Sequence, residues 1–420
     1  MSTVLKVLPL LVVLVLLMPP FKFHILVAGF AGGVIAALIG GLTIAKVTSV
    51  YLSGLSQMMG ITSVMVFAAT AIFLSQAGAT KALLGLIERL FKGKLAYVAA
   101  GMVLVQALAT YAAGCGAANT LVTAPLIANL VGFVPHVVAG LSIVSGASWA
   151  TSPSSAESAF ISKAMNISVT EYAEFMRPYT VIFWIVGMLL AWYGVKRYGS
   201  RLGKDHHNQE KEEVPLGTQL RHALPFLVLL TLILVGPPIN RALNKSLFTT
   251  VTTPLITVIV ACLSMRLNPN QVGEMLIDGA RPILRYLFLV GLFLGFIKIM
   301  GEIGTFDALA SLPGLMPVGL ITAGALVIAF LIAIPSAAYT VAIDALIIPV
   351  MAAVGVPIWA FGFVGIAVAQ GAMISPVQIN VAATAHGFGV DIMQVVKNNI
   401  KYMVLIMILT VSFGVFVTLR

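Results

Sequence analysis

Charged side chains are scarce in this sequence. Asp, Glu, Lys and Arg make up 9% of its 420 residues, and hydrophobic residues make up 60%. A soluble domain has about 25% charged residues. The mean hydropathy is +1.06. This composition excludes an ordinary soluble globular protein and predicts an all-α polytopic membrane protein. Because a spanning helix needs roughly 20 apolar residues, the chain has room for about 10–12 transmembrane segments.

Several features of enzymes and pumps are also absent. There are two cysteines, Cys115 and Cys262, both in apolar surroundings, so no disulfide framework is expected. The sequence has no Cys/His cluster for zinc, no phosphate-binding Gly-rich loop with a lysine, and no nucleophile elbow with His and Asp partners. We therefore expect neither an enzyme nor an ATP-driven pump, and no metal centre or organic cofactor.

Acidic residues are outnumbered by basic ones, which gives a net charge of +10. In a membrane protein, basic residues gather in cytoplasmic loops, so nucleic acid is not an expected partner. Residues 196–222 form the long hydrophilic segment of the chain. We predict that they are a cytoplasmic linker between a first half (1–195) and a second half (223–420). The predicted location is the bacterial inner (cytoplasmic) membrane, with several passes through the lipid bilayer and without a cleavable signal peptide.

Apolar runs predict the membrane spans, and an amphipathic stretch at residues 80–92 predicts a helix that lies in the interface. Residues 160–177 and 266–285 are more polar and are expected to reach water. The predicted spans are residues 4–18, 23–44, 56–77, 95–113, 178–195, 222–239, 248–265, 283–300, 317–334 and 399–419.

Two polar breaks interrupt these apolar runs. Residues 145–158 carry seven hydroxyl side chains, a proline and a carboxylate, and residues 371–380 contain a second break with the sequence Gly-Ala-Met-Ile-Ser-Pro-Val-Gln-Ile-Asn. At membrane depth, polar and irregular backbone persists only where it lines a cavity or is buried in protein. The two stretches are therefore predicted to form the two halves of a substrate site.

The irregularities of the first half recur in the same order in the second half, at nearly one offset along the chain. Paired breaks in two repeats are typical of transporter binding sites, and such repeats are commonly inverted. The matching pairs are Gly78 with Gly304, Ala117 with Ala337, Val131 and Pro135 with Val354 and Pro357, and Ser152 with Ser375.

Each Ser-Pro pair has the order of a helix start, with serine as N-cap and proline in the first turn. Ser375 to Gln378 and Ser154 to Glu157 also have capping-box spacing. Two helix N-termini that face each other would bind an anion without an arginine, and carbonyls freed at the breaks could hold a sodium ion. The candidate substrate-binding residues are Asn119, Thr120, Ser148, Thr151, Ser152, Ser154, Ser336, Thr340, Ser375, Gln378 and Asn380.

Two acids, Glu157 and Asp344, are candidates for ion coupling, because acids inside membrane segments usually have a function. Alternatives stay open for both. Glu157 would serve only as a cap if it closes a capping box. Asp344 would take no part in ion coupling if it faces a water-filled vestibule or pairs locally. His136 and His386 flank loops and are expected to be structural. Lys298, Glu302 and Asp307 are expected to be interfacial.

The second break, followed by Gly387-Phe-Gly-Val-Asp-Ile-Met-Gln-Val-Val-Lys397, resembles the C-terminal part of anaerobic C4-dicarboxylate carriers of the ion transporter superfamily (DcuC-like) and related citrate and dicarboxylate transporters. The stretch from Trp149 to Ser158 resembles the corresponding first-half site. The resemblance implies two inverted repeats, each with a re-entrant hairpin and a broken helix, and suggests a homodimer. It places the hairpin tips near residues 115–120 and 335–340. The Ser-Asn-Thr triplets of the sodium-coupled branch are absent; Ala118-Asn119-Thr120 and Ala338-Tyr339-Thr340 approximate them.

These observations predict a secondary transporter that moves small di- or tricarboxylates by alternating access, coupled to sodium, protons or exchange, as symporter or antiporter. The main alternative is a cation/proton antiporter that uses Glu157 and Asp344 and has no organic substrate. An intramembrane enzyme, a lipid-handling protein and a channel are further alternatives, and the sequence has no motif that favours them.

Overall fold

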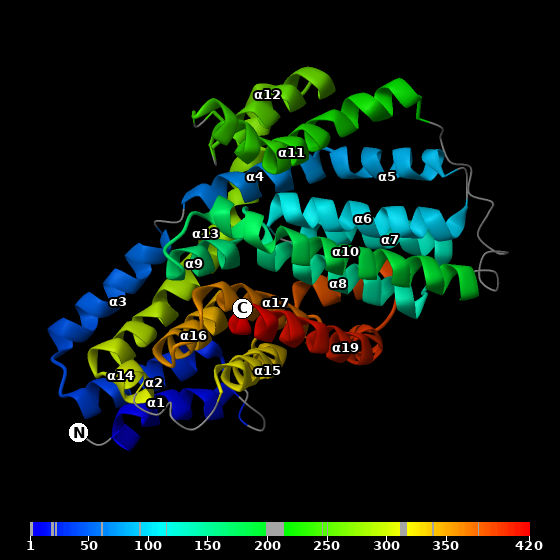
Figure 1. The fold of residues 1–420 in the computed structure, drawn as a ribbon. Coiled ribbons are helices and arrows are strands. Elements are labelled where there is room, and N and C mark those ends of the chain that lie inside the picture. Colours follow the sequence, from blue (N-terminus) through cyan, green and yellow to red (C-terminus); the bar gives the residue numbers. More distant parts are fainter. Residues whose placement is uncertain are drawn as a thin grey trace.

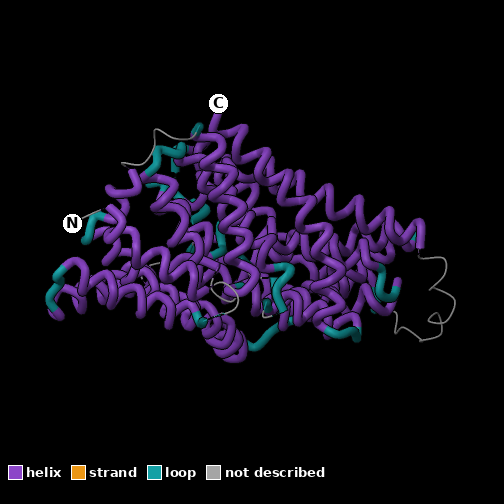
Figure 2. The backbone as a smooth tube through the Cα atoms, turned by 90° about the horizontal axis from the view of Figure 1, so that it is seen from below, coloured by secondary structure: helices purple, strands orange, loops and turns teal. Residues whose placement is uncertain are grey.

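A computed structural model describes residues 3–17, 21, 23–59, 62–91, 94–114, 116–198, 214–245, 247–249, 251–310, 317–337, 340–376 and 378–420. These residues form helices joined by short loops, and none of them is in a strand (Figure 2). The all-α polytopic membrane fold is therefore confirmed. Large apolar side chains such as Leu405 (64% exposed) and Ile408 (62%) point outward from the surface, as expected where a helix faces lipid.

The first half contains ten helices in the described residues (Figure 1). They are α1 (Thr3–Leu17), α2 (Ile25–Gly40), α3 (Ile44–Met59), α4 (Thr62–Gln76), α5 (Ala79–Leu90), α6 (Leu95–Ala113), α7 (Ala117–Val131), α8 (Pro135–Thr151), α9 (Ala156–Ala164) and α10 (Val169–Tyr198).

The second half follows after residues 199–213, which fall in the predicted linker and lie outside the described part of the chain. Its elements are α11 (Leu216–Leu243), α12 (Thr252–Met265), α13 (Pro269–Glu302), α14 (Thr305–Ala310), α15 (Val318–Ser336), α16 (Thr340–Ala353), the 3-10 helix η2 (Ile358–Phe361), α17 (Gly362–Ala372), α18 (Ile379–Phe388) and α19 (Ile392–Leu419).

Several predicted boundaries were wrong. The span predicted at residues 56–77 is the end of α3 followed by α4, and the polar stretch 160–177 is shared between α9 and the first turns of α10, which continues through Pro178. The stretches 266–285 and 283–300 fall mostly in one 34-residue helix, α13. Polarity alone misplaced these ends, because a helix in a bundle tolerates an internal proline and can leave the membrane without breaking.

Four helices in the described residues are long and apolar enough to cross a membrane by length and composition. They are Leu95–Ala113, Val169–Tyr198, the stretch Leu216–Ile233 of α11, and Ile392–Leu419. Shorter apolar helices, including α16 and the η2–α17 pair, accompany them. Short helices joined by breaks are what the predicted hairpins and broken helices require.

Several helices of the two halves match at one constant offset in residue number. The distance along the chain from the start of α6 at Leu95 to the start of α15 at Val318 recurs between the starts of α7 and α16, of α9 and α18, and of α10 and α19. The first two helices of each half, α1–α2 and α11–α12, lie at opposite edges of the molecule, with α8 and α17 between them (Figure 1). The arrangement has the pattern of an internal two-fold repeat. The inverted orientation of the repeats stays a prediction.

Helices α8 and α17 meet where this repeat would have its axis. A Cβ added at Gly146 would lie 3.6 Å from the Cβ of Ala369, and these two positions are equivalent in the repeat. Gly371 approaches α15 so closely that an added Cβ would lie 2.1 Å from the Phe330 carbonyl oxygen. Such close approaches of small residues are the usual way in which membrane helices pack.

Candidate functional site

The first break joins α8 to α9 and is buried. Helix α8 ends at Thr151, and Ser152 is its C-cap rather than the predicted N-cap of the next helix. The N-cap of α9 is Ser155, whose hydroxyl accepts a hydrogen bond from the Ser158 amide at 3.0 Å. Ser152 instead folds the loop, since its hydroxyl accepts from the Ser154 amide at 2.9 Å and donates to the Tyr111 carbonyl.

The second break joins α17 to α18. Helix α18 begins at Ile379 with Gln378 as its N-cap, so Ser375 does not start this helix either. The Gln378 side chain does not cap the first backbone amides of α18. Its Nε2 donates instead to the Ala337 carbonyl at 3.3 Å. Both predicted Ser-Pro helix starts were wrong, because each serine lies in a turn that precedes the true N-cap.

The hairpin tip of the second half contacts the broken helix of the first half. The Thr340 hydroxyl, at the start of α16, donates to Glu157 Oε1 at 2.6 Å. Glu157 lies in the first turn of α9 and is 4% exposed. Glu157 is therefore more than a cap for its own helix, because its carboxylate bridges the two halves.

The reciprocal contact joins the first hairpin tip to the second broken helix. A Cβ added at Gly116 would lie 2.8 Å from Asn380 Oδ1, so the amide of Asn380 lies directly against the Gly116 backbone. Asn380 is 6% exposed, and its buried Oδ1 has no hydrogen-bond partner within the described part of the chain. Asn380 and Glu157 are separated by the repeat offset, so equivalent positions in the two halves meet the opposite hairpin tips.

The first hairpin tip also fits closely against its own break. Gly114 has φ +64°, a left-handed conformation that favours glycine, and a Cβ added there would lie 2.2 Å from the Ser154 carbonyl oxygen. The Ser154 hydroxyl is buried without a partner. Cys115, between Gly114 and Gly116, lies outside the described residues.

Gln106 on α6 connects the polar residues of the first half, and sequence analysis missed it. It is fully buried, and its Nε2 lies within hydrogen-bond distance of the hydroxyls of Thr120 (2.8 Å), Ser145 (2.9 Å) and Thr110 (3.1 Å). The Thr123 hydroxyl donates to its Oε1 at 2.6 Å. A lone glutamine in an otherwise apolar predicted span was the available signal.

The other predicted residues of the first break support the packing around it. Ser148 accepts a hydrogen bond from the Trp184 indole at 2.7 Å, and the hydroxyl of Thr151 lies 2.7 Å from that of Thr180. This part of the break is therefore held by α10.

The remaining predicted residues are placed by their burial. Asn119 is buried at the start of α7, and Ser375 is buried at the second break. The side chain of Ser336 lies outside the described residues. His136 stacks on Tyr198, as expected for a structural histidine.

Arg177 is a second residue that sequence analysis missed, because it was assigned to water. It lies with Tyr111 and Pro153 in the lining of a small cavity of about 60 Å³ beside the first break. Its Nε is buried without a partner. Arginine is well suited to hold a carboxylate, so this cavity adds a cationic group next to the break.

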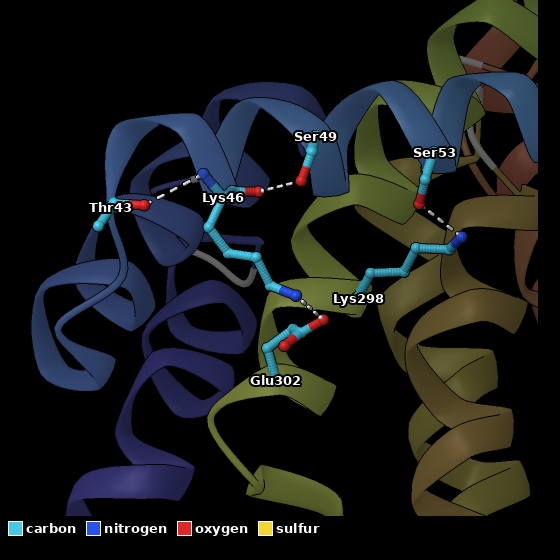
Figure 3. A network of polar contacts seen from close by, with 6 residues as sticks. All are labelled: Thr43, Lys46, Ser49, Ser53, Lys298 and Glu302. Carbon is cyan, nitrogen blue, oxygen red and sulfur yellow. Dashed lines mark hydrogen bonds and ion pairs between the residues drawn. The ribbon is translucent and has the colours of Figure 1, made fainter.

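A larger open cleft of about 620 Å³ lies away from both breaks, between α3 and α13. Lys298 donates to the Ser53 hydroxyl at 2.8 Å, and Lys46 pairs with Glu302 at 2.9 Å (Figure 3). The interfacial position of Lys298 and Glu302 in the membrane stays a prediction. The side chain of Asp307 lies outside the described residues. The described residues contain no group of three or more His, Cys, Asp or Glu side chains that could hold a metal ion.

Comparison with solved structures gives a match over most of the chain. The crystal structure of the YdaH transporter of Alcanivorax borkumensis superposes with a TM-score of 0.56 at 13% sequence identity, and the match covers 87% of this chain and 86% of that one. No protein-family model and no curated protein matches the sequence. The chain therefore shares the fold of a known membrane transporter.

Proposed function

We propose that this protein is a secondary active transporter of the bacterial inner membrane that moves small di- or tricarboxylates by alternating access. The observation that carries the proposal is the exchange of contacts between the halves. Thr340 meets Glu157, and Gly116 meets Asn380, so each hairpin tip contacts the broken helix of the other half. Paired breaks with this relation are typical of transporter sites.

The two helix starts at the breaks would give the proposed substrate site its preference for anions. Helices α9 and α18 both begin at the breaks, and the N-cap side chain of α18 leaves the first backbone amides of that helix uncapped. Free amides and the helix dipole attract a carboxylate. The buried Asn380 amide, within the first turn of α18, and Arg177 beside the first break are the side chains best able to hold it.

The resemblance to C4-dicarboxylate and citrate carriers, and the fold shared with the YdaH transporter, support the same class of function. The proposal includes a homodimer, with the site-bearing helices moving against a scaffold. A cation/proton antiporter without organic substrate is the second candidate, and the fully buried acid Asp344 favours it.

Uptake into proteoliposomes tests the proposal. Labelled succinate and citrate are offered with sodium and proton gradients imposed separately, and we expect one gradient to drive accumulation. Asn380→Leu should raise KM roughly 10- to 150-fold, because a hydrogen bond to a charged group contributes about 1.5–3 kcal/mol.

Asn270→Leu is the matched control, since Asn270 also occupies the first turn of its helix but is exposed. It should leave KM unchanged. Failure of both carboxylates to cross the membrane, with sodium dissipating a proton gradient, would reject the carboxylate carrier in favour of the antiporter.

A further inference from the structure

Asp344 is a buried acid in the second half of the chain. It lies on α16, in the turn that follows Thr340, and its side chain is 0% exposed. Both carboxylate oxygens are buried, and neither has a hydrogen-bond partner among the residues that the structure describes. Buried polar atoms are nearly always hydrogen-bonded, so two unsatisfied carboxylate oxygens call for an explanation such as a bound ion or a proton.

A second acid approaches from the other half of the molecule. Residues four apart share one face of a helix, so Asp344 lies on the face from which Thr340 donates to Glu157. Glu157 and Asp344 interact electrostatically. Two carboxylates that share a buried site cannot both remain charged unless a cation or a proton neutralises them.

Tyr172 on α10 interacts electrostatically with both acids. It donates its hydroxyl to the Ala150 carbonyl at 3.0 Å and supplies no positive charge to them. Arg177, on the same helix, interacts with Tyr111 in the small cavity beside the first break.

The other helices packed around α16 supply no basic partner among their described residues. Lys163 on α9 is exposed. On α13, Lys298 and Glu302 contact α3 instead. The described residues of α15, α17 and η2 include no charged group, and the side chain of Asp307 on α14 lies outside the described part. Among the described residues, the helices packed around α16 therefore supply no countercharge for Asp344.

We propose that Asp344 and Glu157 form a binding site for a monovalent cation, a sodium ion or a proton, at the junction between the two halves. Carboxylate oxygens are the preferred donors for hard cations, and buried acids carry protons in many transporters. The site occurs once. The repeat-equivalent positions of Asp344 and Glu157 are Leu121 and Asn380, so the repeat does not duplicate the acid pair.

The site also explains how a cation would be coupled to an anion, a step that rests on the proposed function. Glu157 lies in the first turn of α9, where a substrate carboxylate would also bind. The negative charges repel each other unless a cation is present, so each ligand should strengthen binding of the other. This linkage is reciprocal and typically about 5- to 150-fold.

The cation site is tested first without substrate, on the purified full chain in lipid. Infrared spectra are recorded during a pH titration in sodium-free buffer and after addition of sodium at fixed pH, with binding of radioactive sodium measured in parallel. We expect a carboxyl band that titrates with pH if the occupant is a proton, or that changes together with saturable sodium binding if it is sodium. Asp344→Asn should remove the response, Glu157→Gln should reduce it, and Asp344→Glu should retain it.

Asp278→Asn is the control, because Asp278 is an exposed acid that pairs with Arg281 at 3.2 Å. It should respond like the wild type. An unchanged response in Asp344→Asn, or a wild-type spectrum that responds to neither cation, would overturn the proposal. Succinate binding is then measured with and without the cation. Loss of succinate binding with an intact cation response would refute the proposed function alone, whereas cation-independent succinate transport would refute the coupling.

Discussion

Replacing Gly114 with alanine is expected to destabilise the protein by roughly 2–5 kcal/mol, from the cost of a left-handed backbone and of overpacking. Gly114 has φ +64°, and an added Cβ would lie 2.2 Å from the Ser154 carbonyl oxygen. That oxygen belongs to the backbone and cannot rotate away. In the Gly114→Ala variant, the first hairpin tip must therefore move away from the first break.

Gly389→Ala separates the cost of the left-handed backbone from the cost of overpacking. Gly389 has φ +62°, but nothing lies within 4 Å of an added Cβ. It should show only the backbone cost, about 1–2 kcal/mol. The measurement is the midpoint of thermal unfolding in detergent, together with uptake. Equal midpoints for the two variants would show that the hairpin tip and the break are not in contact.

The second large effect is expected for Gln106→Leu. Leucine is similar in size but removes the amide that lies within hydrogen-bond distance of Thr120 and Ser145 and accepts from Thr123. Each buried polar group left without a partner costs about 1–3 kcal/mol. Thr120 and Thr123 retain bonds to backbone carbonyls, so the expected loss is roughly 2–4 kcal/mol.

Gln370→Leu is the matched substitution in the second half. Gln370 is buried as well, but its side chain bonds to a single residue, Thr410, within the described part of the chain. Its replacement should cost about 1–3 kcal/mol, less than that of Gln106. The comparison uses unfolding midpoints of the two variants in the same detergent. A smaller loss for Gln106 than for Gln370 would contradict its role as the connecting residue.

The class of fold, the positions of the breaks and the repeat were predictable from the sequence, because hydropathy and the order of Gly and Pro residues are local properties. The helix starts were misplaced, since Ser152 and Ser375 lie in turns whose geometry depends on the segments packed against them. Glu157 and Asn380 could be predicted as site residues from the sequence, but the residues that they contact could not. The bond of Glu157 joins residues more than 180 positions apart, and one sequence holds no information on which distant residues meet.

The bond between Thr340 and Glu157 has a consequence for the synthesis of the protein. The two residues are separated by 183 positions, so Glu157 leaves the ribosome long before its partner is made. At typical translation rates of 5–20 residues per second, this delay is about 10–40 s. During that time the first half must hold a carboxylate inside or beside the membrane without its hydroxyl donor. The first half is therefore expected to need shielding by the insertion machinery until α16 is made.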